Sequence, residues 1–144
     1  MSIIFPTLEG ALYAPSKFKA LKYDMRRYFS GKPTDLQGQR IDFSGAPDFF
    51  VAIWDACRRI PLGETRSYSW LARQVGRPSA SRAAGQAMAR NRFPLLVPCH
   101  RVIRSDGSIG GFGGQSRISL KRNLLKIESL MTPSDISGWD IASL

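Results

Sequence analysis

A cysteine and a histidine stand next to each other in the second half of the chain, at positions 99 and 100. His100 is the only histidine among the 144 residues, and Cys99 is one of only two cysteines. A thiol is a weak nucleophile until it loses its proton, and an imidazole reached directly or through one water commonly accepts that proton near neutral pH. The dipeptide therefore predicts nucleophilic chemistry at Cys99, with His100 as the base.

A structural role is the alternative for both residues. A cysteine often packs as a small hydrophobic side chain, and a histidine is often only a hydrogen-bonded polar group. The partners of a catalytic cysteine are brought together by the fold, so neighbouring positions in the sequence do not decide the question. For the second cysteine, Cys57, core packing is favoured, because it lies on the apolar face of a predicted helix.

The segment before the pair predicts how Cys99 is held. Residues 93–97 are apolar, which is typical of a short buried strand. Pro98 would end that strand, because proline cannot donate a hydrogen bond to a neighbouring strand. Cys99 is therefore expected at the end of a strand, where a reactive group on a rigid scaffold can face a cleft.

The charge of the chain predicts a polyanionic partner. Twenty-one Lys and Arg residues oppose eleven Asp and Glu residues, which gives a formal net charge of +10. Such a balance favours nucleic acid, and a basic protein without such a partner is the alternative. The length suggests one domain, or one domain and a fragment of another, and 43% hydrophobic residues are enough for a core.

Several classes of protein are disfavoured by what the chain lacks. No apolar run approaches the length of a membrane span, and Met1–Leu8, interrupted by Pro6, does not resemble a secretory signal. Two cysteines in unlike surroundings disfavour a disulfide framework and favour the reducing cytosol. Together with one histidine they are too few for a structural zinc site, so neither a metal nor a cofactor is expected.

Hydrophobic periodicity predicts the elements of the N-terminal third. A helix capped by Ser16 runs to Phe29 and is stopped by Gly31 and Pro33. Residues 39–43 alternate between polar and apolar and predict a strand, and residues 44–47 form a linker at the main domain boundary. The apolar face of the helix comprises Phe18, Leu21, Met25, Tyr28 and Phe29.

Three further helices are predicted after the linker, over residues 48–60, from Ser67 to about Val75, and from about Ser79. The last two, joined by a turn that contains Gly76, are typical of a helix-turn-helix. The face of the last helix is almost entirely Ala, Gly and Ser, which would allow close approach to the minor groove of DNA or, alternatively, to a neighbouring helix. Arg82 is the long side chain at its start and is the candidate to probe the base stack.

The segment Pro98-Cys99-His100-Arg101-Val102 resembles the active site of the O6-alkylguanine-DNA alkyltransferases, a family of single-turnover DNA repair proteins. The resemblance covers about 80 residues and four further motifs in the same order along the chain. These motifs are Ile60-Pro61-Leu62-Gly63-Glu64-Thr65-Arg66-Ser67-Tyr68, Arg82-Ala83-Ala84-Gly85-Gln86-Ala87-Met88 with Asn91, Gly107-Ser108-Ile109-Gly110-Gly111-Phe112-Gly113-Gly114, and Lys121-Arg122 with Leu124, Leu125 and Glu128.

The resemblance implies that Cys99 takes an alkyl group from guanine O6 in one irreversible displacement, with thymine O4 as a further candidate position. His100 would accept the thiol proton through a water, and Glu128 would orient the imidazole. Asn91 would brace the site. Tyr68 would help to rotate the nucleotide phosphate and would protonate the leaving guanine.

The resemblance also implies that the damaged base is flipped out of the duplex and that Arg82 fills the gap. The DNA-binding residues implied with Arg82 are Ser67, Ala83, Ala84, Gly85, Gln86, Arg90 and Arg101. The base pocket, which includes backbone carbonyls near Val97 and Cys99, is implied at Val97, Pro98, Val102, Ile109, Gly110, Phe112, Gly113 and Gly114.

Several positions depart from the family pattern. Many relatives carry Tyr in place of Phe112, and some carry Ser in place of Gly113, so two hydroxyl groups are lost. The segment between Gly114 and Lys121 is longer than the pattern predicts for this loop. Most of the family's first domain is missing from residues 1–46.

The fold implied by the resemblance is α+β and mainly helical, with a winged-helix-like helix-turn-helix domain and a small sheet. Residues 47–130 would form the alkyltransferase domain, residues 1–46 a reduced N-terminal segment, and residues 131–144 a tail. The implied partner is double-stranded DNA bearing O6-alkylguanine, bound through its minor groove by a monomer, with no membrane partner. The implied location is the cytoplasm, with the nucleoid when DNA is bound, or the nucleus in a eukaryote.

Two other functions stay open at this point. The chain could be a lesion-binding module without turnover, although inert members of the superfamily commonly replace the cysteine with tryptophan. A Cys-His hydrolase is the other, and it would leave the basic helix-turn-helix unexplained. The helix over 16–29 is expected to pack on the helix over 48–60 rather than on a second copy, and alkyl transfer is expected not to depend on the N-terminal segment.

Overall fold

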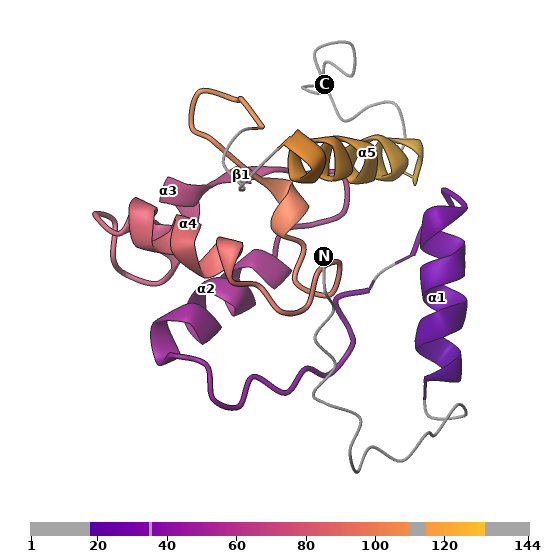
Figure 1. The fold of residues 1–144 in the computed structure, drawn as a ribbon, viewed down its shortest axis with the longest axis horizontal. Coiled ribbons are helices and arrows are strands. Elements are labelled where there is room, and N and C mark those ends of the chain that lie inside the picture. The colour runs from indigo at the N-terminus through magenta and orange to yellow at the C-terminus, as the bar shows by residue number, and fades with distance from the viewer. Residues whose placement is uncertain (1–17, 35, 110–114, 132–144) are drawn as a thin grey trace.

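The computed structural model describes residues 18–34, 36–109 and 115–131. Within these ranges the chain is mainly helical, with one short two-stranded sheet, so the α+β class is confirmed (Figure 1). The strands β1 and β2 pair in parallel, with Arg66 opposite Val102. In chain order the elements are α1 (Lys19–Phe29), α2 (Asp48–Arg58), β1 (Arg66–Ser67), α3 (Tyr68–Gln74), α4 (Ser81–Ala89), the 3-10 helix η1 (Cys99–Arg101), β2 (Val102–Ile103) and α5 (Gln115–Met131).

The helices α3 and α4 form the predicted helix-turn-helix, and α2 packs against both. The Ser67 side chain caps α3 by accepting a hydrogen bond from Trp70 N at 3.1 Å. Gly76, with a φ of +72°, allows the chain to turn out of α3. Trp54 of α2 is buried and donates its indole N–H to Ala87 O of α4 at 2.8 Å, which fixes the two helices against each other.

A second apolar cluster joins α1 to α5 (Figure 1). Tyr28 and Leu36 are buried there against Leu124 and Met131, and further apolar side chains of α1 pack around them. The expected packing of the N-terminal helix on α2 is therefore wrong. The apolar stripe of α2 is already covered by α3, α4 and the two segments that contain Phe43 and Phe93.

The set of buried side chains on α1 differs from the prediction as well. Phe18 and Phe29 were expected on the buried face, but both are exposed. Ser16, the predicted cap, lies outside the described residues, and Phe18 precedes the first residue of the helix. Only part of the predicted apolar face of α1 is used for packing.

Two predicted strands are absent from the described residues. At the first, over 39–43, Arg58 Nη2 donates to Gln37 O and Gln39 O. An arginine side chain, instead of a neighbouring strand, therefore binds these backbone carbonyls. In the second, over 93–97, Val97 N donates to Phe93 O at 2.8 Å and Leu95 has a φ of +72°, so the chain turns tightly instead of extending. Both segments still contribute apolar side chains to the main core.

The segment that was predicted as a longer loop before Lys121 is mostly helical. Helix α5 begins at Gln115, so residues 115–120 form its first turns. Among the residues that the structure describes, no helix is long and apolar enough to cross a membrane.

Candidate active site

Cys99 is the first residue of η1, a single helical turn between Pro98 and strand β2. Arg101 N donates to Pro98 O at 2.9 Å and closes this turn. Cys99 is half-buried, whereas His100 and Arg101 are buried. The prediction of a strand end is corrected: a turn before β2 exposes the thiol and directs the next two side chains inward.

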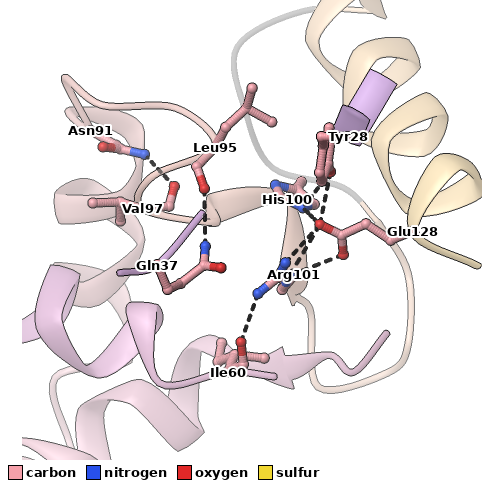
Figure 2. Close-up of polar contacts among 9 residues, drawn as sticks. All are labelled: Tyr28, Gln37, Ile60, Asn91, Leu95, Val97, His100, Arg101 and Glu128. Carbon is pink, nitrogen blue, oxygen red and sulfur yellow. Dashed lines mark hydrogen bonds and ion pairs between the residues drawn. The ribbon is translucent and has the colours of Figure 1, made fainter. Parts of the chain in front are cut away.

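Glu128 of α5 is the centre of a buried polar cluster (Figure 2). Its Oε1 accepts hydrogen bonds from His100 Nε2 at 2.5 Å, from Arg101 Nη2 at 2.8 Å and from the Tyr28 hydroxyl at 2.8 Å. Its Oε2 accepts from Arg101 Nε at 3.0 Å. Glu128 has 0% exposed surface, so these protein groups replace the water that would otherwise solvate the carboxylate.

The partners of Glu128 determine its charge and the tautomer of His100. Burial alone would raise the pKa of Glu128, but the hydrogen bonds and charges of His100 and Arg101 hold this pKa at about 2. Burial lowers the pKa of His100, so the neutral ring is favoured. Because a carboxylate can only accept, Nε2 of His100 carries the proton and Nδ1 is left as the basic nitrogen.

Nδ1 of His100 is buried and has no hydrogen-bond partner among the described residues. An imidazole oriented by a carboxylate on one nitrogen, with the other nitrogen basic, is the arrangement that activates a nucleophile in catalytic triads. The pairing of His100 with Glu128, separated by 28 residues, gives this arrangement next to Cys99.

Arg101 requires a correction, because it was expected among the DNA-binding residues. Only 2% of Arg101 is exposed, and its guanidinium is bound to Glu128 and, through Nη1, to Ile60 O at 2.8 Å. A cation held in this way cannot reach a phosphate. Its role is to neutralise the buried charge of Glu128.

Asn91 braces the turn before the cysteine (Figure 2). Its side chain donates from Nδ2 to Val97 O at 3.0 Å and accepts from Phe93 N at 2.9 Å. Val97 O also accepts from Cys99 N at 2.8 Å. Two donors from within the protein therefore fix this carbonyl, and the expectation that backbone carbonyls near Val97 and Cys99 read the edge of a base stays a prediction.

Tyr68 lies between the helix-turn-helix and the cysteine. Its ring packs within 3.9 Å of the position that a side chain on Gly85 of α4 would occupy. Burial, followed by the charge of Cys99, raises the pKa of Tyr68 above its ordinary value, so its hydroxyl is held as a hydrogen-bond donor. Tyr68 is thus close to both the proposed DNA-reading helix and the nucleophile.

Lys121 of α5 adds a second buried cation at this site. Its Nζ donates to Val102 O and lies 5.8 Å from the centre of the Tyr68 ring. Burial lowers the pKa of Lys121 to about 8, whereas the charges of Cys99 and Cys57 act in the opposite direction. The interior around Cys99 therefore contains positive groups that favour an anion.

The predicted DNA-binding residues on and next to α4 differ in exposure. Arg82, Gln86 and Arg90 are exposed, and the small residues Ala83 and Gly85 are partly exposed. Ala84 is fully buried in the main core, so its expected place on the DNA-binding face is corrected. Ser67 is partly buried and caps α3.

The predicted base pocket is described only in part. Pro98 and Val102 are fully buried, and Val102 belongs to the main core, so its side chain is not available to a ligand. Ile109 is partly exposed. Gly110, Phe112, Gly113 and Gly114 lie outside the described residues.

The sequence reasoning missed Tyr28 as a site residue and gave Arg101 a different role. Tyr28 was assigned to an apolar helix face, although a buried tyrosine hydroxyl usually requires a partner. Arg101 was assigned to DNA, although an arginine next to buried apolar residues usually has to be paired inside the protein. The core role predicted for Cys57 is confirmed: it has 0% exposed surface, and burial raises its pKa.

Comparisons with known proteins give the family of the chain. The family model described as 6-O-methylguanine DNA methyltransferase, DNA binding domain, matches residues 48–130. The methylated-DNA–protein-cysteine methyltransferase of Mycobacterium tuberculosis is 40% identical over 126 residues, which cover 88% of this chain and 74% of that protein.

Similar solved structures include complexes with DNA. The structure of M. tuberculosis OGT in complex with DNA has a TM-score of 0.69 at 39% identity and covers 83% of this chain and 71% of that chain. The structure of S. pombe Atl1 in complex with damaged DNA containing O6-carboxymethylguanine has a TM-score of 0.53 at 34% identity and covers 63% of this chain and 80% of that chain.

Proposed function

The chain belongs to the 6-O-methylguanine DNA methyltransferase family, and on that premise we propose that Cys99 is the residue that accepts the alkyl group. The activity is repair of DNA by direct reversal. One alkyl group moves from guanine O6 to the protein, which is consumed in the reaction. Cys99 is the half-buried cysteine of the chain, whereas the thiol of Cys57 is fully enclosed in the core.

The transfer is a single displacement. The Cys99 thiolate attacks the alkyl carbon, an S–C bond forms, and the C–O6 bond breaks with its electron pair passing to guanine. His100 Nδ1 takes the thiol proton through a water, and Glu128 stabilises the imidazolium that results. Tyr68 is the proposed hydrogen-bond donor to the leaving guanine. A thioether has no easy hydrolytic exit, so each protein molecule repairs one lesion.

DNA binding is assigned to α4 and the residues beside it. Arg82, exposed at the start of α4, is proposed to occupy the space left by the flipped nucleotide, because the target carbon is unreachable inside the base stack. Ala83 and Gly85 allow the helix to approach a narrow minor groove, and the exposed side chains of Gln86 and Arg90 extend this surface. Phosphate contacts by arginine predict that the affinity for duplex falls as salt rises.

The organisation of the chain is also part of the proposal. We assign alkyl transfer to residues 47–130, a reduced first domain to residues 1–46 and a tail to residues 131–144. Ile109, together with Gly110, Phe112, Gly113 and Gly114, is proposed to enclose the base. The protein is proposed to act as a monomer on double-stranded DNA in the cytoplasm or nucleoid, or in the nucleus if the source is a eukaryote.

The observation that carries the proposal is the contact of His100 Nε2 with Glu128 Oε1 at 2.5 Å, directly beside a half-buried cysteine. It provides a nucleophile, a base and a group that orients the base, contributed by η1 and α5. Burying the Glu128 carboxylate is costly and requires Arg101 to neutralise it. A histidine with only a structural role would not require such a partner.

Intact-mass measurement after incubation with an O6-methylguanine duplex tests the proposal. One added methyl group per protein is expected, located on the peptide that contains Cys99. Cys57→Ala is the matched control and should be methylated normally, whereas Cys99→Ala should bind the duplex without transfer. Binding without added mass in the unmodified chain would instead identify a lesion-binding protein, and repeated turnover would contradict the single-use mechanism.

A further inference from the structure

The hydroxyl group of Tyr28 is a buried polar group that the proposed chemistry does not use. Tyr28 belongs to α1 and is only 1% exposed. Its hydroxyl donates to Glu128 Oε1 at 2.8 Å and lies 3.5 Å from His100 Nε2. Figure 2 shows the ring of Tyr28 directed at the carboxylate that His100 and Arg101 also approach. One hydroxyl therefore contacts both parts of the proton-accepting pair.

The position of Tyr28 is fixed by the second apolar cluster. Leu36 and Tyr28 are buried with Leu124 and Met131, so the ring is held on α5, the helix that carries Glu128. Burial raises the pKa of Tyr28 above its ordinary value, which keeps the hydroxyl protonated as a donor. A buried hydroxyl without a partner would cost about 1–3 kcal/mol, so the bond to Glu128 also makes the burial of this ring tolerable.

We infer that Tyr28 is a positioning residue for alkyl transfer, whose hydroxyl holds the Glu128 carboxylate against His100 Nε2. The inference rests on the proposed function, since the pair that Tyr28 positions is the one that accepts the thiol proton. Tyr28 lies outside residues 48–130, which the family model matches. On this inference the N-terminal segment contributes one positioning residue to the site.

The groups around the imidazole determine the sign of the effect. Glu128 and Lys121 face it from α5, Arg101 from η1 and Tyr28 from α1. The hydroxyl of Tyr28 fixes the Glu128 oxygen that His100 Nε2 contacts. Without it, the carboxylate is held less closely against Nε2 and stabilises an imidazolium less, so the pKa of His100 is expected to fall further below its ordinary value. The charges of Arg101 and Lys121, which lower this pKa, stay in place.

The single histidine of the chain makes this effect directly measurable, because the imidazole signals in a proton NMR titration belong to His100 alone. Tyr28→Phe keeps the ring and removes only the oxygen. We expect the titration midpoint of His100 to fall by about half a pH unit or more, which is about a threefold loss of proton affinity.

Tyr23→Phe is the matched control, because Tyr23 lies on the same helix but is 61% exposed. It should leave the midpoint unchanged. The rate of methyl transfer to Cys99 should fall roughly fivefold in Tyr28→Phe, as expected for the loss of about 1 kcal/mol of positioning, and should be normal in Tyr23→Phe. An unchanged or raised midpoint in folded Tyr28→Phe would refute the inference, whatever the outcome of the mass measurement on the unmodified chain.

A second measurement does not depend on a variant that folds. In the unmodified chain the hydroxyl proton of Tyr28 should exchange slowly with solvent and should show a nuclear Overhauser effect to the ring of His100. If exchange instead proceeds at the rate of the exposed Tyr23 hydroxyl, the buried hydrogen bond does not exist in solution and the inference fails.

Discussion

Two charged regions of this molecule are built in opposite ways. In the cluster around Glu128, the carboxylate oxygens are bound by protein donors from α1 and η1, and no part of the carboxylate is exposed. On α4, by contrast, the side chains of Arg82 and Arg90 are exposed. The cluster around Glu128 holds its charges in fixed geometry, whereas the arginines at α4 are accessible to a binding partner.

The difference follows from the work proposed for each region. Proton transfer requires an imidazole of fixed tautomer, so the cost of burying Glu128 has to be offset by the charge of Arg101 and by several hydrogen bonds. DNA binding requires cations that can exchange water for phosphate, and these contribute little to folding. Substitutions in the buried cluster should therefore reduce stability, and substitutions on α4 should reduce binding.

The largest expected effect is that of Arg101→Met on stability. This change leaves the buried charge of Glu128 without its cation, which typically costs 3–5 kcal/mol. Urea denaturation at pH 7 measures the loss. Arg82→Met is the matched control and should change the free energy of unfolding by less than about 0.5 kcal/mol. Similar losses in both variants would remove the distinction between the two regions.

The pH dependence of stability sharpens the same comparison. The pKa of Glu128 is about 2 in the folded protein, against an ordinary value of 4.5, so its contribution is complete above about pH 4.5 and is lost as the pH falls toward 2. The shift corresponds to about 3 kcal/mol. The pKa of His100 is also lowered, so the unfolded chain takes up that proton first and stability begins to fall below about pH 6.5.

Glu128→Gln is the variant that tests this pH dependence by denaturation between pH 7 and pH 3. The acid loss of stability should be smaller in the variant than in the unmodified chain. Asp42 and Asp106, whose pKa values are lowered by hydrogen bonds from Ser44 and Ser108, are present in both proteins, so their contributions cancel in the comparison. Parallel curves would mean that Glu128 is not the charged centre of the cluster.

The regions also differ in how far the sequence predicted them. Helices α3 and α4 are short-range structures, and the periodicity, the Ser67 cap and the turn at Gly76 were sufficient to place them. The link between His100 and Glu128 came from a resemblance to a family, because nothing in local sequence relates two residues 28 positions apart.

The remaining features depend on contacts between distant residues and could not be predicted from short stretches of sequence. The hydroxyl of Tyr28 meets Glu128 across 100 positions, and the apolar pattern of α1 does not reveal that its partner is α5. Residues 39–43 alternate as a strand would, yet the guanidinium of Arg58 binds Gln39 O, so tertiary contacts override the local preference. Arg101 was expected at the DNA from the family resemblance, and nothing in its local sequence indicates that its partner is Glu128, 27 positions away.

A moderate effect is expected for Arg82→Ala, which tests the exposed region. Repair of an O6-methylguanine duplex should slow by about ten- to a hundredfold, or about 1.4–2.7 kcal/mol in the barrier, because the flipped state loses the side chain that fills the stack. Reaction with free O6-benzylguanine, which needs no flipping, should be unchanged. Arg73→Ala on α3, another exposed arginine, is the control. Equal losses on both substrates would place Arg82 in the chemistry instead.

The smallest effect, and the one that separates the two regions at a single residue, is expected at Ser67. Its side chain caps α3, while the residue itself lies in β1 opposite Ile103 of β2, the strand that follows η1.

Ser67→Ala should lower the free energy of unfolding by about 1 kcal/mol through loss of the cap. Ser67→Asp should restore the cap, because aspartate is an equally good capping residue, but it places a negative charge at a residue that is expected to contact DNA. Stability near the unmodified value with weaker duplex binding at low salt would assign both roles to Ser67. If Ser67→Asp binds duplex normally, Ser67 belongs to the scaffold alone, and the DNA surface begins at α4.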